Sequence, residues 1–289
     1  MHYVEAKGIL SSSNGMNVYR GCSHGCIYCD SRSTCYQMNH LFEDIEVKVN
    51  ATTLLESKLR SKRKPCMIGT GSMCDPYLPL EKNLSITRKC LELIYQYGYG
   101  ATVHTKSTLI LRDIELLKKI NEKTKCVVQM TLTTYDEKLC RIIEPNVAST
   151  KERLEVLMKC KEYNIPTVVW LSPILPYIND TLDNLKGILN YCKEANVYGI
   201  IYFGAGLTLR EGNREYFYQK LDEHFPGLKE IYQKRYGLSY EIISPHHNEL
   251  SLYFYNFCKE HHIVSNIDEL FSYMHEFPDI KEYEQLQLF

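Results

Sequence analysis

The chain has 289 residues, of which 44% are apolar and 24% charged, and its formal net charge is −1. These values are ordinary for a soluble globular protein, and the length suits one large α/β domain or one and a half domains. A charge so close to zero excludes a global field that would draw the chain to DNA, RNA or an anionic membrane. No apolar run approaches 18 residues and the start shows no signal-peptide pattern, so we expect a cytoplasmic protein without a membrane segment.

The first predicted strand, Met16–Arg20, leads directly into a loop with three cysteines. Cys22, Cys26 and Cys29 have the spacing C-x3-C-x2-C on a loop punctuated by glycines, so their thiolates can point at one centre. Soft thiolates favour iron–sulfur clusters or zinc. A structural zinc site normally has four protein ligands, and a ferredoxin-type cubane needs a fourth cysteine. Three ligands on a four-iron cube leave one iron open, although Cys35 is an alternative fourth ligand.

Short apolar strands alternate with amphipathic helices between residues 50 and 205. The predicted strands are Cys66–Thr70, Ala101–Thr105, Cys126–Thr133, Thr167–Leu171 and Gly199–Phe203. The predicted helices are 51–62, 84–97, 109–121, 150–163 and 181–195, the last with Thr181 or Asp180 as its N-cap. With the first strand this makes about six βα units, which predicts an α/β fold of the partial (β/α)6 TIM-type barrel class. Ligands of such a barrel are bound in the loops that follow the strands.

The pattern changes after residue 205. Three segments, 211–225, 227–236 and 249–262, are amphipathic with helical period, and no further strand is predicted. We therefore expect two domains: a core barrel over 1–205 and a helical C-terminal extension over 206–289.

Several motifs recur after the predicted strands, in addition to the cysteine loop. They are Gly69–Tyr77 (GTGSMCDPY), His104–Ser107, Thr131–Thr134, Glu144-Pro145, Glu152-Arg153 and Ser172–Ile174. With an aromatic residue, Tyr28, before the third cysteine, this set resembles the radical S-adenosylmethionine (SAM) enzymes. Over roughly residues 1–260 it looks like the branch of that family named after spore photoproduct lyase, often labelled DNA repair photolyase-like.

The resemblance implies a [4Fe–4S] cluster on Cys22, Cys26 and Cys29, with SAM chelating the fourth iron. The reduced cluster then cleaves SAM reductively to a 5′-deoxyadenosyl radical. By the same resemblance the cofactor-binding residues are Tyr28, Ser72, Lys106, Thr131, Thr133 and Arg153. Their chemistry is suitable, because lysine and arginine can neutralise a carboxylate and hydroxyls can bind a ribose. The alternative is that Thr131 and Thr133 are only strand-forming residues and that Arg153 is a solvated helix residue.

The chain departs from the spore photoproduct lyase pattern at two positions. A tyrosine that follows the third cysteine in those enzymes is replaced by Asp30, and a hydrogen-donating cysteine aligns with Ser72. Serine is no substitute, because its O–H bond is far stronger than a thiol S–H bond. Cys74, two residues further on, is the candidate catalytic hydrogen donor. The lyase reaction is therefore in doubt, whereas radical generation is not.

The function expected from the resemblance is a radical SAM enzyme of lyase or transferase type with an unknown substrate, for which a nucleic acid or modified nucleotide is one candidate. The expected partners are SAM and a reductant such as flavodoxin or ferredoxin. The basic run Lys58–Lys64 could bind such an acidic partner, but it also suits a solvated helix end. The alternative function is a non-catalytic iron–sulfur or zinc protein that uses the three-cysteine loop for structure or electron transfer.

Overall fold

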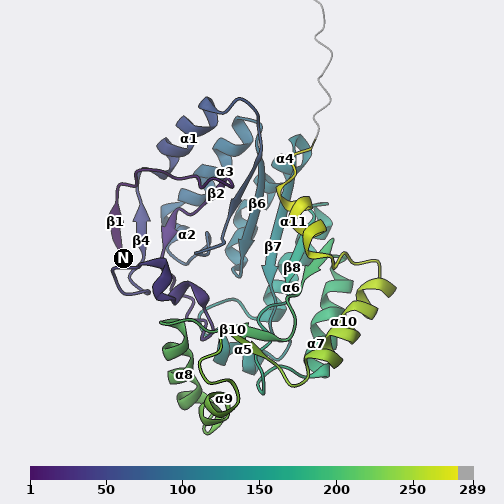
Figure 1. Cartoon of the computed structure of the whole chain (residues 1–289). Helices are drawn as coiled ribbons and strands as arrows, with labels where there is room; N and C mark the ends of the chain where they lie inside the picture. Colours follow the sequence, from purple (N-terminus) through teal and green to yellow (C-terminus); the bar gives the residue numbers. More distant parts are fainter. Residues whose placement is uncertain (279–289) are drawn as a thin grey trace, which may run out of the picture.

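The computed structural model describes residues 1–278 and confirms the α/β fold class. Its central sheet has six parallel strands in the order β2-β5-β6-β7-β8-β9, so neighbours in the chain are neighbours in space (Figure 1). The strands are β2 Gly15–Met16, β5 Met67–Thr70, β6 Gly100–Thr105, β7 Cys126–Thr131, β8 Thr167–Trp170 and β9 Gly199–Ile201. A sequential parallel sheet with helical crossovers is the arrangement expected of a partial TIM-type barrel.

Amphipathic helices connect the strands and cover the outer face of the sheet. They are α1 Ala51–Ser61, α3 Ile86–Gln96, α4 Ile114–Lys123, α6 Thr150–Glu162 and α7 Leu182–Glu194, with the short α2 Glu81–Leu84 and α5 Glu137–Ile143 between them. In α3 the buried residues Thr87, Cys90, Leu91 and Ile94 recur at helical spacing. Thr181 caps α7 by accepting from the backbone N–H of Asn184 at 3.2 Å, as predicted.

The predicted strand Met16–Arg20 is in fact two strands that belong to different sheets. β2 pairs with β5, whereas β3 (Tyr19–Arg20) pairs with β4 (Glu46–Lys48). β4 also pairs with β1 (His2–Val4), which makes a small sheet in the order β1-β4-β3. The strands β1 and β4 were not predicted, because three residues are too few to show a period.

After residue 205 the chain is mainly helical, but it also contains two strands, which corrects the prediction of none. β10 (Gly206–Thr208) pairs in antiparallel fashion with β11 (Glu241–Ile243), and the two form a ribbon. The helices are α8 Asn213–His224, α9 Leu228–Tyr236, α10 His247–Glu260 and α11 Ile267–His275. Within residues 1–278, no helix has the length and hydrophobicity that a membrane crossing requires.

The last of these helices, α11, contributes to the core of the barrel. Leu270 and Met274 form one apolar cluster with Val127, Val168 and Ile201. The strand registers place these three side chains on the same face of the sheet as Gln129 and Trp170. That face is the inner one, because the crossover helices cover the other. The C-terminal helix therefore fills part of the barrel interior.

Candidate functional site

The cysteine loop follows β3 and is fixed at both of its ends by the backbone. The N–H of Cys22 donates to the carbonyl of Phe42 at 2.9 Å, and the N–H of Ile27 donates to the carbonyl of Ile143 at 3.0 Å. Gly21 has a φ of +86°, and a Cβ there would lie 2.6 Å from the Phe42 oxygen. Only glycine allows so close an approach in this conformation. The glycine that opens the motif thus holds the loop against the neighbouring segment.

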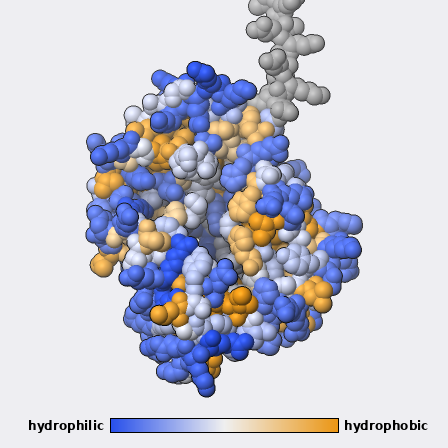
Figure 2. Space-filling view, in the orientation of Figure 1, coloured by the Kyte–Doolittle hydropathy of each residue, from blue (hydrophilic) through white to orange (hydrophobic). Residues whose placement is uncertain are grey.

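A cavity of about 190 Å³ lies between this loop and the carboxyl ends of the strands. It is lined by Cys22, Cys26 and Cys29 together with Ser72, Cys74, Lys106 and Thr131, all of which were predicted as site residues. Tyr28, Thr133 and Arg153 do not line it. In the space-filling view the molecule is hollowed near its centre (Figure 2). The structure thus brings most of the predicted set to one cavity.

In this structure the three thiols are not arranged as ligands of a single tetrahedral zinc ion. Among the described residues, no group of three metal-type donors that includes these cysteines has its atoms within 4.8 Å of one another. Tetrahedral zinc with Zn–S bonds of about 2.3 Å requires sulfur atoms about 3.8 Å apart. Burial raises the pKa of the Cys22 thiol, and raises that of Cys26 to about 11. Thiolates at Cys22 and Cys26 therefore need a cationic centre to stabilise them.

Lys106, just after β6, lies inside a network of buried polar groups. Its ammonium donates to the Tyr28 hydroxyl oxygen at 2.8 Å, and it lies 3.3 Å from a Glu144 oxygen and 3.4 Å from the Cys26 sulfur. The Tyr28 hydroxyl in turn donates to Glu144. Burial raises the pKa of Glu144, but Arg153 and Lys106 outweigh that effect and lower it to about 2. The Glu144 carboxylate is therefore ionised at neutral pH.

Arg153 lies behind this network and is completely buried. Its guanidinium pairs with Glu144 and donates to the backbone carbonyls of Thr131 at 2.8 Å and Ala148 at 2.9 Å. The capping box of α6, between Ser149 and Glu152, fixes the start of the helix that carries it. The structure thus places Arg153 where it holds Glu144, one step away from the cavity.

Asp75 is a second buried carboxylate, on the other side of Lys106. It accepts from the Thr105 hydroxyl at 2.7 Å and from the backbone N–H groups of Lys106 and Tyr77 at 2.8 Å, and it bonds the His24 imidazole at 2.9 Å. Burial raises the pKa of Asp75, but the His24 imidazole and these hydrogen bonds lower it to about 2. Because His24 lies between two of the cysteines, Asp75 ties the cysteine loop to the end of β6.

On the inner wall of the barrel beside the cavity, polar and aromatic side chains contact one another in a row. The His104 ring stacks on Trp170 with centroids 5.0 Å apart, and its Nε2 lies 2.8 Å from the Thr131 hydroxyl. Trp170 donates to Gln129 at 2.7 Å. Burial, and then the charge of Lys106, lower the pKa of His104 to about 4. The imidazole is therefore neutral at physiological pH and fixes the orientation of Thr131.

A larger cavity of about 680 Å³ adjoins the first and shares Cys29 and Ser172 with it. Its walls include Tyr28, Asp30, the 203–208 segment and the β11 strand with Tyr240 and His247. Phe203 is 56% exposed and Tyr240 45% exposed, so both offer aromatic surface. The β10–β11 ribbon, which the sequence did not predict, forms one side of this space.

Of the remaining candidates, Cys35 and the basic run Lys58–Lys64 lie apart from the cavity, whereas Cys74 lines it. Cys35 is exposed, and its sulfur lies 3.4 Å from the guanidinium of Arg210. The basic run Lys58–Lys64 ends α1 and leads into the amino end of β5, whereas the cysteine loop lies at the carboxyl ends of the strands. Cys74 is buried, and its thiol faces the carbonyl of Gly21 at 2.8 Å.

Sequence reasoning gave no individual role to His24, Asp75, His104 or Trp170. The available signals were the position of His24 within the cysteine motif and the two polar side chains, His104 and Lys106, at the end of one strand. Glu144 belonged to a motif, but its partners could not be read from the sequence.

The chain is similar in sequence to proteins of a virus and of a bacterium. A protein of Acidianus two-tailed virus is 28% identical over 261 residues, which is 85% of each chain. A protein of Mycobacterium bovis is 27% identical over 229 residues, 76% of this chain and 66% of the relative, so the chain spans just under two thirds of that relative's length. Both relatives are described as uncharacterized.

Solved structures of spore photoproduct lyase share the fold. One variant superimposes with a TM-score of 0.63 at 15% identity over 89% of this chain and 78% of the other. Another, solved with AdoMet and dinucleoside spore photoproduct, has a TM-score of 0.59 at 13% identity over 84% of this chain and 72% of the other. The model of the radical SAM superfamily matches residues 16–192, which is more than half of the sequence. The chain therefore belongs to the radical SAM superfamily, whose cofactors are a [4Fe–4S] cluster and S-adenosylmethionine.

Proposed function

We propose that Cys22, Cys26 and Cys29 hold the cluster, and that the protein is an enzyme whose substrate binds in the larger adjoining cavity. The observation that carries this proposal is the convergence of three thiols, Lys106 and Thr131 on one cavity at the carboxyl ends of the strands. When bound, the cluster and SAM supply a 5′-deoxyadenosyl radical by reductive cleavage. The chain itself binds, orients and shields the reacting groups.

Each of the other site residues has a role in this proposal. Lys106 binds a carboxylate of the ligand in this proposal, because its side chain is cationic and 16% exposed at the cavity. Thr131 and Ser72 offer hydroxyls at the same cavity, and Tyr28 lines the larger one. Arg153 acts as a positioning residue through Glu144, and the buried Thr133 supports the same strand end.

Metal analysis and product analysis test the cluster and its activity together. Anaerobically reconstituted protein should contain about four irons and four sulfides, and with dithionite and SAM it should release 5′-deoxyadenosine slowly. Alanine at Cys22, Cys26 or Cys29 should abolish both. Alanine at Cys35 is the matched control and should leave both unchanged. Loss of the cluster in the Cys35 variant alone would overturn the assignment.

The non-catalytic alternative makes a different prediction for the same sample. A zinc protein would contain one zinc and no sulfide, and an electron-transfer protein would contain the cluster without cleaving SAM. A structural metal needs no lysine and hydroxyls around the cavity that the three cysteines line, which is why the enzyme is the better supported function.

For the substrate we propose a nucleoside or base, free or within a nucleic acid. The walls of the larger cavity include exposed Phe203 and Tyr240, which can stack on a planar ring. Among the described lining residues there is no lysine or arginine, but there are two acids, Asp30 and Glu241. The cavity therefore suits an uncharged ring, and any phosphates would remain outside it.

Efficient repair of spore photoproduct is not part of this proposal. After fragmentation of such a dimer a thiol must return a hydrogen atom to the product radical, and Ser72 and Asp30 occupy the positions of the usual donor and tyrosine. Cys74 lines the same cavity as Ser72 and is the only replacement thiol that we propose there. Multiple anaerobic turnovers of a dinucleotide substrate to thymines would contradict this expectation. If they occurred, Cys74→Ala would show whether Cys74 is the donor.

The electron donor is expected to be a flavodoxin or ferredoxin that binds near the cysteine loop. The basic run Lys58–Lys64 is a poor docking site for it, because that run lies at the opposite end of the strands from the cysteines. Replacement of Lys62, Arg63 and Lys64 by alanine should leave flavodoxin-driven SAM cleavage unchanged. A clear decrease would show that the donor binds at that end.

A further inference from the structure

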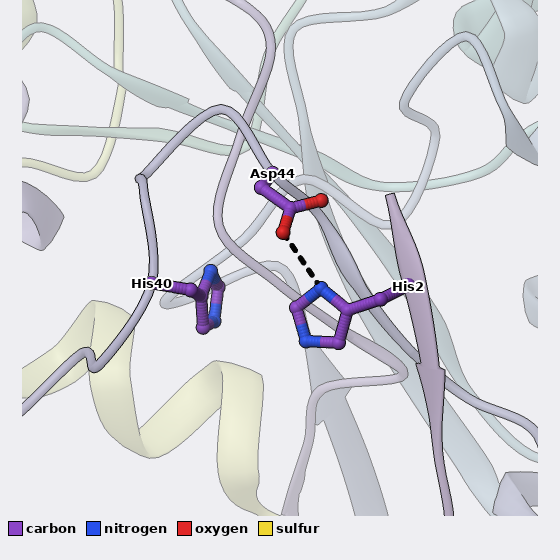
Figure 3. A group of neighbouring side chains, drawn as sticks. All are labelled: His2, His40 and Asp44. Carbon is purple, nitrogen blue, oxygen red and sulfur yellow. Dashed lines mark hydrogen bonds and ion pairs between the residues drawn. The ribbon is translucent and has the colours of Figure 1, made fainter.

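A second group of metal-type donors lies outside the cysteine site, in the small N-terminal sheet. It consists of His2 on β1 and of His40 and Asp44 in the segment that precedes β4. One donor atom from each residue lies within 4.8 Å of the others, and all three residues are half-buried (Figure 3). The His2 and His40 rings meet edge to face with centroids 4.8 Å apart.

The strand register adds a fourth donor to this group. β1 and β4 run parallel with His2 directly opposite Glu46, so these side chains emerge side by side on one face of the sheet. Glu46 lies close to His40 as well, since a carboxylate oxygen is 3.8 Å from the His40 Nε2. Two imidazoles and the Asp44 carboxylate therefore meet at one place, with the Glu46 carboxylate beside them.

The hydrogen bonding of the His40 ring suits a residue that binds a metal ion. Its Nδ1 lies 3.0 Å from the carbonyl oxygen of Leu41, so Nδ1 carries the hydrogen and donates it. In the neutral ring Nε2 then presents a lone pair, and this nitrogen is buried without a hydrogen-bond partner among residues 1–278. An imidazole whose Nδ1 donates to a backbone carbonyl while Nε2 remains free is the form that binds metals in proteins.

We propose that His2, His40 and Asp44, with Glu46 beside them, bind one divalent transition-metal ion such as zinc. Imidazole and carboxylate ligands without sulfur suit zinc and its neighbours rather than an iron–sulfur cluster. The site is separate from the cluster, but it is structurally linked to it. The Phe42 carbonyl between His40 and Asp44 accepts the Cys22 N–H. The ion thus pins the segment that supports the amino end of the cysteine loop.

The rival explanation is a metal-free cluster of ion pairs. The Met1 ammonium lies 2.8 Å from one Asp44 oxygen, and the His2 Nδ1 lies 2.9 Å from the other. These contacts account for His2 and Asp44. The His40 Nε2 has only the Glu46 carboxylate at 3.8 Å, which is beyond hydrogen-bond distance.

The test uses cluster-loaded protein without an affinity tag, dialysed anaerobically against zinc chloride. Metal analysis should find one zinc in addition to the irons. Zinc X-ray absorption should show only nitrogen and oxygen ligands at about 2.0–2.2 Å, without the sulfur shell at about 2.3 Å that binding to the cysteines would give. The sulfur shell, or the absence of bound zinc, would overturn the proposal.

Variants make the test residue-specific. His40→Ala should weaken zinc binding by at least about tenfold, since even outer-shell changes cost that much. Asp44→Asn should also weaken it, and since Asp44 is 40% exposed this change does not threaten folding. The control is His246→Ala, which removes an exposed histidine that lies 3.9 Å from Glu249. Equal zinc affinity in the wild type and in both site variants would refute the assignment.

Discussion

The cysteine loop is held from two sides by two buried carboxylates that work by different means. Asp75 is bound mainly by neutral donors, two of which are backbone N–H groups, together with His24. Glu144 is bound by the charged side chains of Arg153 and Lys106 and by Tyr28. The first arrangement is rigid, because the backbone fixes its donors. The second can rearrange, because Lys106 can turn toward a ligand while Arg153 keeps Glu144 paired.

The largest expected effect on stability comes from removing Glu144, the anchor of the cysteine loop that is held by charged side chains. Glu144→Ala should lower the free energy of unfolding by about 3–5 kcal/mol, because it leaves the Arg153 guanidinium buried and unpaired. Urea denaturation of the apoprotein measures this. The double variant Glu144→Gln, Arg153→Met should recover most of the loss, since it removes both charges. A cost below about 1 kcal/mol for Glu144→Ala would show that the network is not an anchor.

A change at Asp75, the anchor that is held mainly by neutral donors, should lower the free energy of unfolding by less. Asp75→Asn retains the shape but turns one oxygen into a donor that faces other donors. We expect a loss of about 1–3 kcal/mol in the same urea experiment, the range for leaving buried polar groups unsatisfied. A loss as large as that of Glu144→Ala would remove the distinction between the two anchors.

A change at Lys106 should weaken ligand binding more than it lowers stability. Lys106→Ala should weaken SAM binding to the reconstituted protein by about 1–3 kcal/mol, the range for losing a charge-assisted hydrogen bond. Its effect on unfolding should be smaller than that of Glu144→Ala, because Arg153 still pairs with Glu144. Isothermal titration with SAM measures the first quantity, with Lys58→Ala as a control at the far end of the sheet. Unchanged SAM affinity would show that the pocket is misplaced.

The smallest expected difference is in acid sensitivity. Both carboxyls have folded-state pKa values lowered to about 2, from ordinary values of 4.5 for Glu144 and 3.8 for Asp75. The stability that each contributes is complete above its ordinary pKa and is lost as the pH falls toward 2. Glu144 therefore begins to lose its contribution at the higher pH. The unfolding free energy of the wild-type apoprotein should fall more steeply below about pH 4.5 than that of Glu144→Gln. Parallel curves would contradict this assignment.

The cysteine loop and the βα order were predictable because they depend on local spacing and on a repeated pattern. The role of Arg153 could not be predicted. Its partner Glu144 lies nine residues earlier, and the two side chains meet only because the chain turns between α5 and α6. The strands β1, β4, β10 and β11 were missed because each is three residues long and their pairing is decided by distant segments. His40 shows no pattern at all, because its neighbours come together only when the N-terminal sheet forms.

The position of α11 has a consequence for how the chain folds during synthesis. Val127, Val168 and Ile201 are made early, but Leu270 and Met274, which cover them, emerge from the ribosome last among these contacts. A nascent chain that ends before residue 267 therefore exposes apolar residues on the inner face of an otherwise formed sheet. Contacts so distant in sequence form slowly, and exposed apolar surface invites aggregation. These apolar residues thus remain accessible to chaperones until α11 has been synthesised.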